Sequence, residues 1–216
     1  MPKIYGFGNA LIDIEISVSE DELSSLSINK GSMEHINFDQ KMAWLELFKS
    51  RIQSRKPGGS IANSLHAAAS QGSICTFSCS MGEDLEKKLF LQGFNEKLIK
   101  TSFQHSNNPT GTCFIFVTPD GERTMASNLS ANEDLNPNCL DLEKLSQSDW
   151  LMFDAFSVCT SNGFRTAKEA LNIAKQNNVK IAFGLADINL IKSNLREIEW
   201  VLDQSIDLLF SNEKEI

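Results

Sequence analysis

The sequence predicts an α/β fold in which helices cover the faces of a mainly parallel sheet. Short runs rich in β-branched and aromatic residues alternate with segments of helical periodicity, which is the pattern of such a fold. The chain has 216 residues, enough for one large domain with an apolar core. Its composition of 41% hydrophobic and 22% charged residues is typical of a globular protein. We find no internal repeat and no low-complexity linker, so we expect a single domain over 1–216.

Five apolar runs are expected to be strands of the main sheet. Each is short, rich in Ile, Phe, Leu or Val, and separated from the next by helical patterns or turn residues. In chain order they are IYGFGNAL (4–11), ICTFSC (74–79), WLMFDAF (150–156), VKIAFGL (179–185) and DLLFSN (207–212).

Helical periodicity appears in three segments between these runs. In NFDQKMAWLELFKSRI, Asn37 is placed to cap a helix. The apolar side chains that we expect on its buried face, at steps near 3.6, are Phe38, Met42, Leu45 and Ile52. SNGFRTAKEALNIAKQNN repeats this spacing, and NLREIEWVLDQ leads into the last strand.

Two regions, 12–34 and 111–128, interrupt the alternation. The second predicts a β-hairpin, because two runs rich in Thr, Phe, Ile and Val flank Pro119-Asp120-Gly121. A hairpin inside an α/β alternation indicates a small sheet that stands off the main layer. Lids that exclude water from a site are often built in this way.

Charge and cysteine content argue against several classes of protein. The net charge of -8 does not favour binding to nucleic acid, which needs clustered Lys and Arg. No stretch approaches the roughly 20 apolar residues of a membrane-spanning helix, and no cleavage site follows the N-terminal run. The five scattered cysteines lack zinc-site spacing, so we expect buried free thiols. We therefore expect a cytoplasmic protein without nucleic-acid or membrane partners.

Gly58 and Gly59 precede an alanine-rich helical segment at about 60–70. Glycines permit positive φ and close approach to the backbone, and a helix start offers unpaired N–H groups. The pair matches neither the Gly-Lys-Ser/Thr ending of a phosphate-binding loop nor the dinucleotide pattern G-x-G-x-x-G. By itself it predicts a tight turn.

Three polar residues accompany the glycine pair. Asn63 lies one helical turn into the alanine-rich segment, Asn9 follows the first strand, and Asp13 lies four residues further on. Ligands of open α/β sheets bind at strand ends, and a carboxylate among neutral polar groups suits the adjacent hydroxyls of a sugar or ribose. For each residue taken separately, a turn or cap is an equal alternative.

Five segments, taken in chain order, resemble the PfkB (ribokinase-like) family of carbohydrate and nucleoside kinases, nearest its adenosine-kinase-like branch. They are GNALIDIEISV, PGGSIANSLHAAASQG, MGEDLEKKLF, PTGTCFIFVTPDGERTMASNLSAN and DLLFSNEKEI. The resemblance covers almost the whole chain, and Gly-Gly-Ser-x-x-Asn matches the family's amino-terminal signature. It implies a ribokinase-like αβα sandwich whose small β lid, here parts of 12–34 and 111–128, closes over the acceptor.

The resemblance also implies roles in substrate binding. Asn9 and Asp13 match positions that bind sugar or ribose hydroxyls, and Gly58, Gly59 and Asn63 match the acceptor loop. The expected ligand is therefore a small-molecule sugar or nucleoside, with the choice between them left open.

Further matches concern the substrate and the phosphoryl donor. Asp154 falls where many relatives carry an acidic residue that contacts substrate, and Asn212 and Glu215 match an Asn-x-x-Glu element linked to magnesium and phosphate. ATP and Mg²⁺ are the family's cofactors. The sequence ends at Ile216, before the Gly-Ala-Gly-Asp segment that supplies the family's catalytic base and before most of its ATP site. The C-terminal part of the fold is thus expected to be missing, and no catalytic residue is assigned.

Three functions remain in competition. The first is the acceptor-binding portion of a kinase that transfers the γ-phosphoryl group of MgATP to a primary hydroxyl. The second is a non-catalytic remnant or binding module that keeps only the acceptor pocket; its unpaired sheet edge predicts poor solubility or a homodimer. The third, a nicotinamide-dependent oxidoreductase, rests on the α/β alternation and lacks the dinucleotide fingerprint.

Overall fold

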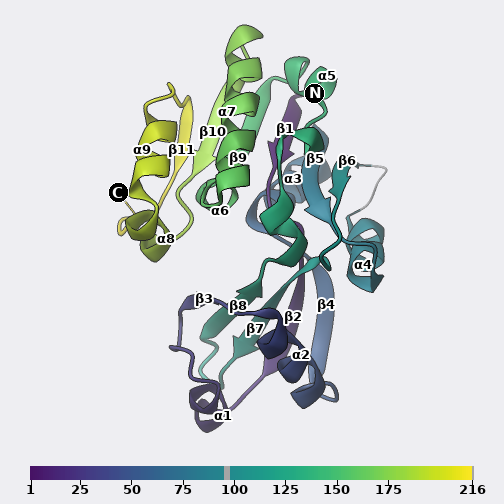
Figure 1. The fold of residues 1–216 in the computed structure, drawn as a ribbon, viewed down its shortest axis with the longest axis vertical. Coiled ribbons are helices and arrows are strands. Elements are labelled where there is room, and N and C mark those ends of the chain that lie inside the picture. The colour runs from purple at the N-terminus through teal and green to yellow at the C-terminus, as the bar shows by residue number, and fades with distance from the viewer. Residues whose placement is uncertain (95–97, 216) are drawn as a thin grey trace.

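The computed structural model describes residues 1–94 and 98–215, whose strands form two sheets (Figure 1). The larger sheet is parallel throughout, with the strand order β11-β10-β9-β1-β5-β6, which confirms the predicted parallel sheet. Its strands are β1 (Lys3–Phe7), β5 (Ile74–Met81), β6 (Ile99–His105), β9 (Trp150–Asp154), β10 (Lys180–Gly184) and β11 (Leu208–Phe210).

Helices cover both faces of this sheet, as an αβα sandwich requires. On one face Ile61 of α3 packs in the same cluster as Phe77 of β5; on the other, Leu171 of α7 packs with Phe153 of β9. The helices are α3 (Ser60–Ser70), α4 (Leu85–Gly93), α5 (Leu142–Ser146), α6 (Ala155–Val158), α7 (Ser161–Gln176), α8 (Ile188–Ser193) and α9 (Leu195–Leu202). Two 3₁₀ turns, η1 (Ser130–Asp134) and η2 (Pro137–Cys139), connect them to β8.

The smaller sheet has the order β3-β8-β7-β2-β4 and lies beyond one end of the larger sheet (Figure 1). Its antiparallel pair β7–β8 is the predicted hairpin. The strands are β2 (Leu11–Ser17), β3 (Met33–His35), β4 (Ile52–Gly58), β7 (Gly111–Val117) and β8 (Arg123–Asn128). Two helices accompany them, α1 (Glu20–Ser25) and α2 (Phe38–Leu47).

The prediction for α2 is partly wrong in its buried face and wrong in its end, although Leu45 packs against the core as expected. Asn37 caps the helix as expected, but Phe38 and Met42 are about half exposed, at 48% and 49%. Trp44 is buried instead, with its ring edge-on to Phe114 and Phe116 of β7 at centroid distances of 5.6 and 5.5 Å. The buried face of α2 is the one that contacts the aromatic residues of β7, and these contacts cannot be predicted from the sequence of the helix alone.

Three predicted boundaries are also corrected. Ile52 does not extend α2 but begins β4, which pairs with β2. The run 4–11 is two strands, because the chain leaves the larger sheet after Phe7 and enters the smaller one at Leu11. The run 150–156 ends as a strand at Asp154, which caps α6.

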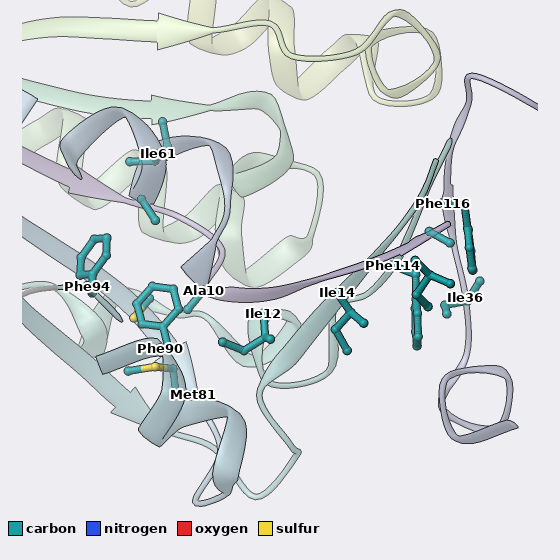
Figure 2. Close-up of a cluster of buried hydrophobic side chains, with 14 of the residues drawn as sticks. Ala10, Ile12, Ile14, Ile36, Ile61, Met81, Phe90, Phe94, Phe114 and Phe116 are labelled. Atoms are coloured by element: carbon teal, nitrogen blue, oxygen red, sulfur yellow. The ribbon is translucent and has the colours of Figure 1, made fainter. Parts of the chain in front are cut away.

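One apolar cluster joins the two sheets (Figure 2). It runs from Phe90 of α4 and Phe94, which follows that helix, through Ile12 and Ile14 of β2, to Phe116 of β7. The smaller sheet is therefore anchored by a continuous core. The five cysteines carry free thiols and all but Cys159 are buried, as predicted. Within residues 1–94 and 98–215, every helix is too short or too polar to traverse a lipid bilayer.

Candidate functional site

A cavity of about 330 Å³ lies where the two sheets meet. The smaller sheet supplies one wall, and the first residues of α3 and α6 supply the other. Of the residues predicted for the site, those that line it are Asn9, Asp13, Gly59, Asn63 and Asp154. Segments far apart in the sequence thus converge on one cavity, as their places at strand and helix ends suggested.

The glycine pair brings the backbone against Asn9 and Asp13. A Cβ added to Gly58 would overlap the Asp13 carboxylate, and one added to Gly59 would overlap the Asn9 carbonyl oxygen. Gly59 also has φ +104, in the region that favours glycine. Gly58 does not line the cavity but lies behind Asp13, where the absence of a side chain makes room for that carboxylate.

Asp13 is a largely buried carboxylate on β2, between Lys56 of β4 and Cys113 of β7 in the sheet register. It accepts no hydrogen bond from the described residues. Burial raises its pKa from 3.8 to about 6, and the charge of Arg123 opposes that rise. A carboxylate removed from water without a donor is unfavourable, so this side chain is available to a ligand that donates hydrogen bonds.

The side chains of Asn9, which is partly buried, and Asn63, which is exposed, also lack an intramolecular partner among the described residues. In the described part of the chain neither side-chain amide makes a hydrogen bond, although the Asn63 backbone N–H donates to the Gly59 carbonyl at 2.9 Å. Each amide offers a donor and an acceptor. The cavity therefore contains one carboxylate and two amides that intramolecular contacts do not satisfy.

Asp154 differs from Asp13, because its carboxylate already accepts hydrogen bonds from within the protein. Its Oδ1 accepts hydrogen bonds from the Ser157 backbone N–H at 3.0 Å and from the Ser157 hydroxyl at 2.7 Å. Burial raises its pKa, while hydrogen bonds from Ser157 and Ser60 lower it. Asp154 thus caps α6 and links that helix to the first turn of α3 at the cavity wall.

Part of the cavity lining is apolar, and the sequence analysis did not single out its residues. It is formed by Leu11, Met33, Ile115 and the half-buried ring of Phe156. Ile115 lies between Phe114 and Phe116, which face the core under α2. Alternation along a strand sends neighbours to opposite faces, and this period of two is the signal that could have found the wall.

A second cavity of about 480 Å³ adjoins the first. The two share Asn9, Met33, Leu129 and Phe156, and the second extends from them toward His35 and Asp187. A ligand larger than a simple sugar would therefore find further space beyond Phe156.

Asn212 and Glu215 do not line either cavity. The Asn212 side-chain amide donates to Glu215 Oε1 at 2.6 Å, and its backbone N–H donates to Glu215 Oε2 at 3.1 Å. Asn212 is exposed and Glu215 is partly buried. Within residues 1–94 and 98–215 we find no group of three or more His, Cys, Asp or Glu side chains that could hold a metal ion.

Comparison with known proteins identifies relatives of this architecture. The pfkB family carbohydrate kinase profile matches residues 31–216. Guanosine-inosine kinase of Escherichia coli (strain K12) is 22% identical across 98% of this chain, which spans 51% of that protein. The chain thus spans about half the length of the curated relatives it matches.

Solved structures of adenosine kinases share the fold. The adenosine kinase from Sinorhizobium meliloti has a TM-score of 0.89 and 26% identity, covering 99% of this chain and 66% of that one. The Anopheles gambiae adenosine kinase, in complex with P1,P4-di(adenosine-5) tetraphosphate, has a TM-score of 0.86 and 23% identity, covering 98% and 64%.

Proposed function

The chain belongs to the pfkB family of carbohydrate kinases, and from that membership we propose that its cavity binds a ribonucleoside as the acceptor of phosphoryl transfer. One observation carries the proposal. Asn9, Asp13 and Asn63 converge on the cavity and make no side-chain hydrogen bonds within the described residues. Such groups are satisfied by a ligand that presents several hydroxyls at once.

The polar end of the cavity suits ribose. The ionised Asp13 carboxylate accepts hydrogen bonds from two adjacent hydroxyls, and each such bond involves a charged acceptor and is correspondingly strong. The Asn9 and Asn63 amides donate to or accept from the remaining hydroxyls. The bare backbone at Gly59 allows the sugar to approach the start of α3.

The apolar end suits a nucleobase. Phe156 offers a ring face, and Leu11, Met33 and Ile115 form the surface around it. A free sugar would leave this surface against water, whereas a planar base would cover it. The relatives named as guanosine-inosine kinase and adenosine kinase support purine nucleosides as the first ligands to test.

The phosphoryl donor is treated separately, because membership of the family implies ATP and Mg²⁺. Asn212 and Glu215 are hydrogen-bonded to each other, and the described residues form no metal-binding cluster. We therefore assign no magnesium site and derive no step through the ion. The role of the smaller sheet is to cover the acceptor and exclude water during transfer.

Calorimetric titration tests the proposal directly. Adenosine, guanosine, inosine, ribose and fructose are titrated separately, each with and without MgATP. We expect at least one nucleoside to bind more tightly than either sugar, and Asp13→Asn to weaken that binding. Asp21→Asn is the control, because Asp21 is exposed on α1. If no nucleoside binds, or if ribose binds as tightly, the nucleoside assignment is wrong.

The same titrations separate binding from transfer. ADP formation in the presence of nucleoside and MgATP would identify the chain as a kinase. Nucleoside binding without ADP formation would identify it as a binding module that keeps only the acceptor pocket.

A further inference from the structure

Helix α2 has an unexpected buried residue. Lys41 is 3% exposed, whereas its neighbour Met42 is 49% exposed. Removing an ammonium group from water is unfavourable unless hydrogen bonds replace the water. Rotating the helix toward Met42 would avoid this loss, so a specific contact must hold Lys41 inside. That contact is the backbone carbonyl of Thr110, which accepts a hydrogen bond from Lys41 Nζ at 3.2 Å.

Thr110 is held from the opposite side by the larger sheet's end. The Asp84 carboxylate accepts hydrogen bonds from the Thr110 backbone N–H at 2.6 Å and from its hydroxyl at 2.8 Å. The Gly82 backbone N–H donates to the same hydroxyl at 3.1 Å. All polar groups of the fully buried Thr110 are thus bonded, by Lys41 on one side and by Asp84 and Gly82 on the other.

The hydrogen bonds of Thr110 are important because of where this residue lies between the two sheets. The chain passes between the two sheets four times in the described residues: before β2, after β4, before β7 and after β8. Thr110 is the last residue before β7, whose Gly111 and Cys113 pair with Leu11 and Asp13 of β2. The bonds to Thr110 therefore fix the point at which the cavity wall leaves the larger sheet.

We propose that Lys41 is a positioning residue: together with Asp84 it clamps Thr110 and holds the smaller sheet at the spacing that the nucleoside cavity requires. This inference rests on the proposed function for its effect on binding, but not for the clamp itself. Burial lowers the pKa of Lys41, and the charges of Glu86 and Asp84 oppose that effect while Arg55 adds to it.

The test compares Lys41→Met with Lys49→Met in the 216-residue chain by hydrogen exchange and by nucleoside titration. Met keeps the length of the side chain and removes the donor. Lys49 lies just beyond the same helix with a side chain that is 75% exposed, so its replacement is a matched control. Asp84→Asn replaces one of the two carboxylate oxygens that accept from Thr110, keeps an acceptor for the cap of α4, and so weakens the clamp from the other side; it is measured in the same way.

In Lys41→Met we expect amide exchange in segments 11–13 and 111–113 to become about tenfold faster, as the loss of one charged hydrogen bond predicts. We expect the nucleoside Kd to rise by about the same factor. Exchange in β9 and β10 should match the wild type, and Lys49→Met should change neither quantity. Asp84→Asn should give the same local pattern.

Two results would overturn the clamp. One is wild-type exchange in both segments of Lys41→Met. The other is faster exchange throughout β9 and β10 as well, which would make Lys41 a general packing residue. If no nucleoside binds the wild type, the proposed function fails while the exchange comparison still decides the clamp. If Lys41→Met does not fold, Asp84→Asn decides it by the same two segments.

Discussion

Gly58 lies directly against the carboxylate of Asp13, so closely that a methyl group at position 58 would occupy the space of the carboxylate oxygens. This relationship connects the glycine pair of the sequence to the cavity. The first glycine admits the carboxylate between β2 and β4, and the second turns the chain into α3 beside Asn9. A mutation at either position therefore acts on the site through its geometry.

Gly58→Ala should displace Asp13 from the cavity wall. Because the overlap is with a buried group, we expect a loss of about 2 kcal/mol in the free energy of unfolding, together with weaker nucleoside binding. Urea denaturation and calorimetric titration measure the two effects. Gly184→Ala is the control, since a Cβ there would meet Asp154 Cβ at an ordinary 3.6 Å. Equal stability of the two variants would contradict the close packing at Gly58.

The raised pKa of Asp13 predicts a stability that falls as pH rises. The folded carboxyl titrates near 6 and the unfolded one near 3.8, so between these values the folded chain binds more protons than the unfolded chain. The contribution of the Asp13 carboxyl to the free energy of unfolding is full below pH 3.8 and is lost as the pH passes 6. Asp13→Asn should abolish this slope and melt at a higher temperature than the wild type at pH 7.

Ligand binding should show the opposite dependence, because hydroxyls donate to the ionised carboxylate. Melting temperatures of both proteins at pH 4–8, with and without nucleoside, separate the two effects. A difference between wild type and Asp13→Asn that stays constant over this range would show that Asp13 titrates normally.

Phe156→Ala should separate base recognition from sugar recognition. The ring is half-buried and borders both cavities, so its removal deprives a base of its stacking surface while leaving Asn9 and Asp13 in place. We expect nucleoside affinity to fall about tenfold, in the range of a lost aromatic contact, and ribose affinity to stay unchanged. An equal loss for both ligands would place the base elsewhere.

The two faces of α2 should respond differently to truncation. Trp44→Ala removes a buried ring that contacts Phe114 and Phe116, and should lower the free energy of unfolding by about 3–5 kcal/mol. Phe38→Ala lies on the exposed face and should change it by less than about 0.5 kcal/mol. Chemical denaturation compares them. A larger loss of stability in Phe38→Ala than in Trp44→Ala would show that the buried face is the one that the sequence pattern predicts.

Local patterns in the sequence predict most of the larger sheet. Apolar runs identify its inner strands, and the turn residues around Asp120 identify the hairpin. They do not predict β4 or β6, because IQSRKPG and IKTSFQH contain many polar and charged residues, as edge strands do. They also misplace the buried face of α2, since Lys41 is held inside by Thr110, which lies 69 residues away in the chain.

The candidate site divides in a similar way. Asn9, Asp13 and Asn63 could be predicted because polar groups at strand and helix ends are unusual for a core. The period of two along a strand separates Ile115 from Phe114 and Phe116, but the local sequence does not say which of the two faces meets the cavity. Only the pairing of β2 with β7, and the position of α2, tells them apart.

Strand β7 assigns alternate residues to separate tasks. Phe114 and Phe116 belong to the core that anchors the smaller sheet, while Cys113 and Ile115 face the cavity side. Substitutions at 113 and 115 can therefore reshape the ligand's surroundings without disturbing the residues that keep the sheet folded. Such a strand allows ligand preference to change by single substitutions that leave the anchoring core in place.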